Sequence, residues 1–168
     1  MGTEYSLAHL KEFVEFFDWK LSDGRQVTFR MAVRFADHCY TDERLPVVDG
    51  CYTVPGKQKP RVFCTDRHVR SFQVPAILRD LFLKPGQTIS MTMENNWATF
   101  CLQMKPAIPR GKRYYVFFRV QFLGENPNTD PLAMDLYIES AYVKDVQVRF
   151  RRLAPFGRIV EEAVFGKQ

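Results

Sequence analysis

The sequence predicts an α+β fold, with a mainly antiparallel twisted sheet of about six or seven strands and about three helices. Two patterns predict this class. Several segments alternate between apolar and polar residues and are joined mostly by connections of hairpin length, whereas helical spacing of apolar residues is confined to short regions. The 168 residues, 46% of them hydrophobic, suffice to bury one core, so a single globular domain over residues 1–168 is expected.

The first segment, residues 6–17, carries apolar side chains at helical spacing with charged residues between them. The apolar residues are Leu7, Leu10, Phe13, Val14 and Phe17. An amphipathic helix is therefore predicted near the N-terminus. Residues 16–21 also alternate, and Ser22-Asp23-Gly24 is a strong turn signal, so a hairpin that begins inside this segment is the other interpretation.

Residues 26–38 carry the clearest strand pattern in the sequence. Every second residue from Val27 to Phe35 is apolar, and the intervening positions include Arg30, Arg34 and His38. One face of this strand is therefore expected to pack and the other to carry charge. Pro and Gly recur between residues 40 and 60, which predicts a long irregular connection with one short strand near residues 51–54.

Two helices are predicted in the middle of the chain. The first begins at Arg67, after a short strand at residues 61–64, because Thr65-Asp66 is a good N-cap. The second has Pro75 in its first turn, where proline is tolerated, and ends before Pro85-Gly86. The remaining predicted elements are strands at residues 87–93, 97–104, 113–122 and 134–143 and a final helix at residues 155–165.

Composition excludes several classes of protein. No segment approaches the ~18 consecutive apolar residues that cross a bilayer, and Glu4, Lys11 and Glu12 interrupt any secretory signal. A cytoplasmic protein that does not bind membranes is therefore predicted. The motifs of common serine hydrolases, zinc proteases, P-loop NTPases and dehydrogenases are missing, so no cofactor and no metal are expected.

The four cysteines, Cys39, Cys51, Cys64 and Cys101, include no C-x-x-C pair, in a chain large enough to fold without disulfides. They are predicted to be reduced thiols. Another interpretation is a zinc site, because Cys64 and His68 are four residues apart and Cys39 and Cys51 would complete a tetrahedral set.

Positive charge is concentrated in three segments. The net charge is only +5, yet residues 57–70, 105–119 and 144–158 carry local excesses of four, five and four positive charges. Arginines, which make forked contacts with phosphate, are interleaved with aromatic residues there, as in surfaces that bind RNA or single-stranded nucleic acid. The residues predicted to bind nucleic acid are Arg30, Arg119, Arg110, Lys112, Arg113, Arg149, Arg151 and Arg152. Solvated strand edges that resist aggregation by their charge are the alternative.

A candidate site is predicted where two strands end. Strand alternation places His38 on the same face as Arg34, and a later strand turns from apolar to polar at Ser140 and Tyr142. If the strand ends meet, they form an acid–base and phosphate-binding group that needs no metal. Its members are His38, Arg34, Arg119, Ser140 and Tyr142. The alternative is that His38 caps its strand and that Ser140 and Tyr142 satisfy backbone groups.

Three segments of the sequence are similar to those of a known protein family. They are Arg34-Phe35 through His38-Cys39-Tyr40-Thr41, the segment from Arg67 to Leu81, and Leu136-Tyr137-Ile138-Glu139-Ser140-Ala141-Tyr142. The chain resembles a sparsely characterised family of small bacterial proteins on plasmids and integrative elements, some labelled stationary-phase growth adaptation protein. This resemblance implies no established activity. The Ser-Ala-Tyr strand is also faintly similar to the last strand of RNase toxins of the barnase, colicin and RelE type, which cleave RNA without metal.

These observations favour a nucleic-acid-interacting protein of a bacterial mobile element, with RNA or another single-stranded nucleic acid as partner. As an enzyme, it would be a metal-independent endoribonuclease in which His38 is the base or the acid, Arg34 and Arg119 bind phosphate, and Tyr142 or Ser140 assists. The alternative is a non-catalytic accessory or regulatory module that binds a protein partner through an aromatic-rich surface. Whether the protein is an enzyme stays open at this level.

Overall fold

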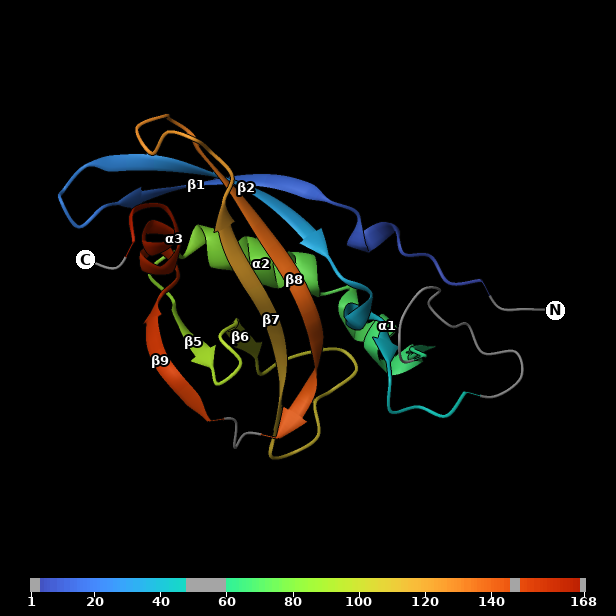
Figure 1. The fold of residues 1–168 in the computed structure, drawn as a ribbon. Helices are drawn as coiled ribbons and strands as arrows, with labels where there is room; N and C mark the ends of the chain where they lie inside the picture. Colours follow the sequence, from blue (N-terminus) through green and yellow to red (C-terminus); the bar gives the residue numbers. More distant parts are fainter. Residues whose placement is uncertain (1–3, 48–59, 146–148, 167–168) are drawn as a thin grey trace.

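The computed structural model describes residues 4–47, 60–145 and 149–166. Its main sheet contains seven strands in the order β1-β2-β8-β7-β6-β5-β9 (Figure 1). These strands are β1 (Phe13–Lys20), β2 (Gln26–Phe35), β5 (Thr88–Thr92), β6 (Trp97–Cys101), β7 (Lys112–Phe122), β8 (Leu132–Asp145) and β9 (Phe150–Pro155). Strands β3 (Thr41–Asp42) and β4 (Val62–Phe63) form a separate pair.

Three α-helices accompany the sheet: α1 (Thr65–Ser71), α2 (Val74–Leu83) and α3 (Phe156–Phe165). The predicted α+β class is therefore confirmed, and the sheet is mainly antiparallel as expected. It is nevertheless mixed, because β2 and β8 pair in parallel. Within the described parts of the chain, none of the helices has both the length and the apolar character needed to cross a membrane.

The core lies between α2, α3 and one face of the sheet. Figure 1 shows α2 behind the long strands β7 and β8. Alternate residues of β2, namely Phe29, Met31 and Val33, are completely buried, as the period of two in this segment predicts. They meet the apolar stripe of α2, which includes Leu78 and Leu81.

The helix predicted at residues 6–17 is wrong. The segment instead forms a short 3-10 turn, Ala8–Leu10, followed by β1, which pairs with β2 along its whole length. The apolar positions between Phe13 and Phe17 satisfy both periods, and pairing with β2 decides between them by burying Phe17 against Phe29. The hairpin interpretation, with its turn at Ser22-Asp23-Gly24, describes the observed structure.

Several element boundaries also differ from the prediction. Strand β2 ends at Phe35, and residues 37–39 form a 3-10 turn, so His38 lies beyond the strand. The sequence pattern does not predict strand β9, because Arg151 and Arg152 obscure its alternation and its partner β5 is distant in sequence. The short strand predicted at residues 51–54 lies outside the described residues.

Gly157 allows α3 to pack closely on β1. A Cβ atom there would lie 2.3 Å from the Trp19 ring, whose indole nitrogen donates a hydrogen bond to Glu161 at 3.1 Å. Gly157→Ala is expected to lower the free energy of unfolding by about 1–2 kcal/mol, because this overpacking outweighs the better helix propensity of alanine. Urea unfolding measures the change. Gly86→Ala, where a Cβ meets nothing within 4 Å, is the control, and equal losses in both variants would contradict the packing argument.

Candidate functional site

An open cleft of about 610 Å³ lies over β7 and β8. Strand β7 contributes Arg119, and β8 contributes Tyr137, Glu139, Ser140 and Tyr142. The intervening β8 residues, Ile138 and Ala141, face the core. The cleft therefore occupies the opposite face of the sheet. The segment that follows β2, the helix α1 and the β5–β6 hairpin complete its lining.

A β-bulge in β8 creates the polar floor of this cleft. Phe117 of β7 pairs with Ser140, whereas Phe118 pairs with Ile138, which leaves Glu139 as an extra residue. Before the bulge the even-numbered residues of β8 face the core, and beyond it the odd-numbered residues do. The bulge is therefore why the apolar face of this strand turns polar at Ser140, and it directs Glu139 and Ser140 into the cleft together.

Hydrogen bonds fix the orientation of Glu139. Arg119 Nε donates to one carboxylate oxygen at 2.6 Å, and the side-chain amide of Asn96 donates to the other at 2.6 Å. Asn96 is buried, and its amide oxygen accepts a hydrogen bond from the Thr92 hydroxyl. A carboxylate from β8 is thus held by two donors, one from the neighbouring strand β7 and one from the β5–β6 hairpin.

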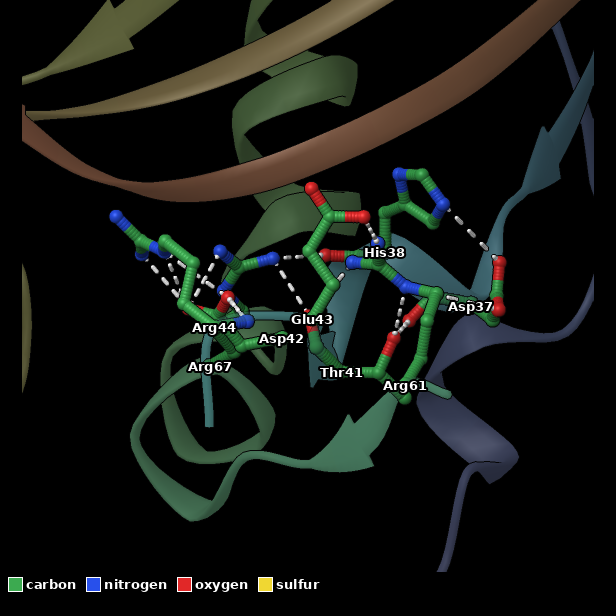
Figure 2. Close-up of polar contacts among 8 residues, drawn as sticks. All are labelled: Asp37, His38, Thr41, Asp42, Glu43, Arg44, Arg61 and Arg67. Carbon is green, nitrogen blue, oxygen red and sulfur yellow. Dashed lines mark hydrogen bonds and ion pairs between the residues drawn. The ribbon is translucent and has the colours of Figure 1, made fainter. Parts of the chain in front are cut away.

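His38 enters the cleft from the 3-10 turn after β2 (Figure 2). The turn is anchored by Cys39, which is completely buried and whose amide donates to the carbonyl of Ala36 at 3.2 Å. The imidazole itself is 42% exposed, and its Nε2 atom lies 3.8 Å from Asp37 Oδ1. The cleft lining therefore contains a partly exposed imidazole beside a carboxylate.

Arg67 of α1 holds the segment that carries His38 (Figure 2). Its guanidinium donates to the carbonyls of His38 at 3.1 Å and Thr41 at 2.6 Å, and to the carboxylate of Asp42 at 2.9 Å. The same guanidinium lies 4.7 Å from the centre of the Tyr142 ring. Arg67 is buried, so it acts as a structural connection between α1, this segment and β8.

Asp42 is ionised in this network. The hydrogen bonds that the Arg44 guanidinium donates lower the pKa of Asp42 strongly, against the opposing effect of burial, and the charge of Arg67 adds to the shift. The carboxylate is buried between the two arginines. Its role is to neutralise them, and because Asp42 is only 6% exposed, its carboxylate presents little surface to a ligand in the cleft.

Arg61 connects the same segment to β4. Its Nε donates to the Thr41 hydroxyl at 2.9 Å, and Nη1 lies 3.3 Å from Glu43. Across the whole cleft, five carboxylate side chains accompany four arginines. The large cleft is therefore rich in charge but nearly balanced.

The structure brings His38, Ser140, Tyr142 and Arg119 together in this cleft, whereas Arg34 lies outside its lining. Arg34 forms a two-pronged ion pair with Asp135, with both N–O distances 2.7 Å. The expectation that His38 and Arg34 share a strand face is wrong, because β2 ends before His38.

The other residues predicted to bind nucleic acid are dispersed. Four have partners: Lys112 with Asp145, Arg113 with the Phe100 ring, Arg151 with Asn95 and Arg152 with Glu162. A smaller pocket of about 250 Å³ lies beside the cleft. Arg30 and Arg110 line neither of the two, whereas Arg149 lines the smaller pocket. In the segment 57–70, the described arginines Arg61, Arg67 and Arg70 are buried and serve as internal connections.

Sequence reasoning missed the residues that hold this site together. Glu139 stood inside the polar segment of residues 137–142, but the bulge that exposes it depends on pairing with β7. Asn96 has the signal of a turn residue, and its burial against Glu139 follows only from the folded hairpin. The basic segment 57–70 predicts Arg67 as a surface residue of a helix, whereas the structure buries it.

Cys39, Cys64 and Cys101 are free thiols, and Cys51 lies outside the described residues. Burial raises the pKa of Cys39 to about 12, so this thiol is protonated at neutral pH. In the ranges 4–47, 60–145 and 149–166, no cluster of three or more His, Cys, Asp or Glu side chains is arranged to hold a metal ion. His68, a candidate zinc ligand from its spacing to Cys64, contacts the carbonyl of Ser6 through Nε2 at 2.9 Å.

The fold and the cleft together define an α+β protein with a polar cleft of nearly balanced charge on the face of the sheet opposite the core. The family model of the YjaZ family matches residues 1–162, so the chain belongs to the YjaZ family. Searches among curated proteins and among solved structures found no match. These comparisons do not confirm the resemblance to mobile-element proteins or to RNase toxins.

Proposed function

We propose that the cleft binds single-stranded RNA and cleaves it by acid–base catalysis without a metal ion. One observation carries the proposal: His38, Glu139 and Arg119, from segments far apart in the sequence, line one open cleft together with Ser140 and Tyr142. An imidazole, a carboxylate and a guanidinium are the acid, base and phosphate-binding groups that such a reaction needs.

In the proposed reaction, Glu139 removes the proton from a ribose 2′-hydroxyl. The 2′-oxygen attacks the adjacent phosphorus, and the bond between phosphorus and the 5′-oxygen breaks. Protonated His38 gives its proton to the leaving 5′-oxygen, so the products are a 2′,3′-cyclic phosphate and a free 5′-hydroxyl. Arg119, 2.6 Å from Glu139, is placed to neutralise the charge that develops on the phosphate.

The carboxylate suits the base and the imidazole suits the acid because of their neighbours. Donors from Arg119 and Asn96 hold Glu139 as an acceptor in one orientation. Asp37, at 3.8 Å, is within ion-pair distance of a protonated His38. Ser140 and Tyr142 would contribute hydroxyl groups to substrate positioning. The proposal extends to a cytoplasmic location, where RNA is abundant, and to carriage on a mobile element, which rests on the resemblance alone.

A second candidate function is a non-catalytic module that binds a protein partner. It is favoured by large apolar side chains that are exposed on the described surface, among them Leu83 at 81%, Leu153 at 64% and Leu102 at 63%. Side chains of this kind are common at protein interfaces when they form a continuous patch. This candidate predicts no RNA cleavage.

The test is incubation of the purified protein with a single-stranded oligonucleotide in the presence of EDTA. The substrate carries one ribose in an otherwise deoxyribose strand. The expected result is cleavage at that ribose, with a 2′,3′-cyclic phosphate identified by mass spectrometry, and an intact all-deoxyribose control. Cleavage that EDTA abolishes, or a product with a 5′-phosphate, would refute the mechanism. Absence of cleavage would favour the protein-binding module.

A further inference from the structure

A smaller pocket of about 250 Å³ adjoins the large cleft. The two share Glu94, Asn96, Ser140 and Tyr142, so they form one continuous groove. The smaller pocket also reaches Lys144, near the end of β8, and Arg149, just before β9. The two cations come from different elements and line the same pocket.

The charge of the two pockets differs. In the large cleft the arginines lie against carboxylates, as Arg67 does with Asp42 at 2.9 Å and Arg119 with Glu139 at 2.6 Å. In the smaller pocket, Lys144 and Arg149 have no ion-pair partner among residues 4–47, 60–145 and 149–166. Its lining contains one carboxylate, that of the exposed Glu94. Because uncompensated positive charge attracts phosphate, the smaller pocket is more favourable to an anion than the balanced large cleft.

The smaller pocket also has an aromatic wall. The rings of Phe117 and Tyr142 both line it, with centroids 5.3 Å apart. Arg67, 4.7 Å from the Tyr142 ring, fixes that ring from the large cleft. Aromatic rings next to free cations are the combination that holds a base and its phosphate in single-stranded nucleic acid.

We propose that the smaller pocket is a subsite for the nucleotide next to the one cleaved, with Lys144 and Arg149 binding its phosphate and Phe117 and Tyr142 contacting its base. This inference rests on the proposed function, because it assigns the same RNA strand to both pockets. The two pockets then have different roles. The smaller pocket supplies most of the affinity for RNA, and the charge-balanced cleft is where the phosphodiester bond is cleaved. The groove therefore spans at least two nucleotides.

The test measures binding separately from cleavage. A fluorescent 2′-O-methyl RNA oligonucleotide, which has no free 2′-hydroxyl to attack, is titrated by anisotropy at several salt concentrations. The variants are Lys144→Gln and Arg149→Gln. Each is expected to weaken binding about fivefold at 0.1 M salt and to reduce the slope of log affinity against log salt by about 0.7, the value for one lost phosphate contact on a single strand. Lys20→Gln, on the edge strand β1 and outside both pockets, is the control and leaves both quantities unchanged.

The outcomes separate this inference from the proposed function. If Lys144→Gln and Arg149→Gln bind with the wild-type slope while the wild type cleaves RNA, the subsite is wrong and the proposed function stands. If the wild type binds with a salt slope that these variants reduce but never cleaves RNA, the subsite stands and the catalytic proposal fails. If the wild type does not bind RNA, both are wrong.

Discussion

His38→Ala is expected to lower the rate of RNA cleavage by about 10²–10⁴-fold, because the leaving 5′-oxygen loses its proton donor. Glu139→Gln is expected to cause a loss of the same order, since an amide keeps the shape of the side chain but cannot accept the proton from the 2′-hydroxyl. Initial rates on the single-ribose substrate measure both. Cleavage by His38→Ala at the wild-type rate would remove this residue from the mechanism.

Glu125→Gln is the matched control for Glu139→Gln. Glu125 is exposed in the loop between β7 and β8 and lines neither pocket, so its replacement should leave the rate unchanged. The double variant His38→Ala/Glu139→Gln tests whether the acid and the base act together. Groups that act as a unit give a combined loss far smaller than the product of the single losses. Independent, multiplying losses would argue against one concerted proton transfer.

Arg67→Met is expected to lower the free energy of unfolding by about 3–5 kcal/mol, the usual effect of removing one partner from a buried ion pair. The substitution preserves apolar volume but removes the donors to the carbonyls of His38 and Thr41, and it leaves Asp42 with Arg44 alone. Urea unfolding measures the loss. The rate of RNA cleavage should fall as well, because the segment that carries His38 is no longer held.

The control for this substitution is Arg25→Met. Arg25 pairs with Asp23 at 2.7 Å, but its side chain is 53% exposed, so its loss should cost no more than about 1 kcal/mol. A loss of similar size in Arg67→Met would show that the buried network contributes little to stability. The segment after β2 would then have to be positioned by its backbone hydrogen bonds.

Local sequence patterns correctly predict those helices and strands whose tertiary contacts agree with the periodicity of their own apolar residues. The alternation from Val27 to Phe35 became β2, and the helix that contains Pro75 became α2. The same reasoning failed at residues 6–17, because the apolar positions there satisfy a helix and a strand equally well. Pairing with β2 decided the outcome, and such pairing is invisible in the segment itself.

In the candidate site, too, some residues are predictable from local sequence patterns and others only from tertiary pairing. The position of His38 at the end of a predicted strand identifies it, and a change from apolar to polar residues identifies Ser140 and Tyr142. That change results from the bulge in β8. The sequence does not mark Glu139 as a functional group, because its exposure depends on the register between β7 and β8. Strand alternation groups Arg34 with His38 only if the strand continues past Phe35, where it in fact ends.

The sequence by itself determined the α+β class, the main strand β2, the helices α2 and α3 and the segments that contain the polar residues of the cleft. These follow from periodicity and turn residues, which act over a few positions. Only the tertiary structure decided which charges are free. It buried Arg67 against Asp42, paired Arg34 with Asp135, and left Lys144 and Arg149 without an ion-pair partner in the described part of the chain. Ion pairs form between residues that are distant in sequence, so a count of charges along the chain cannot reveal them.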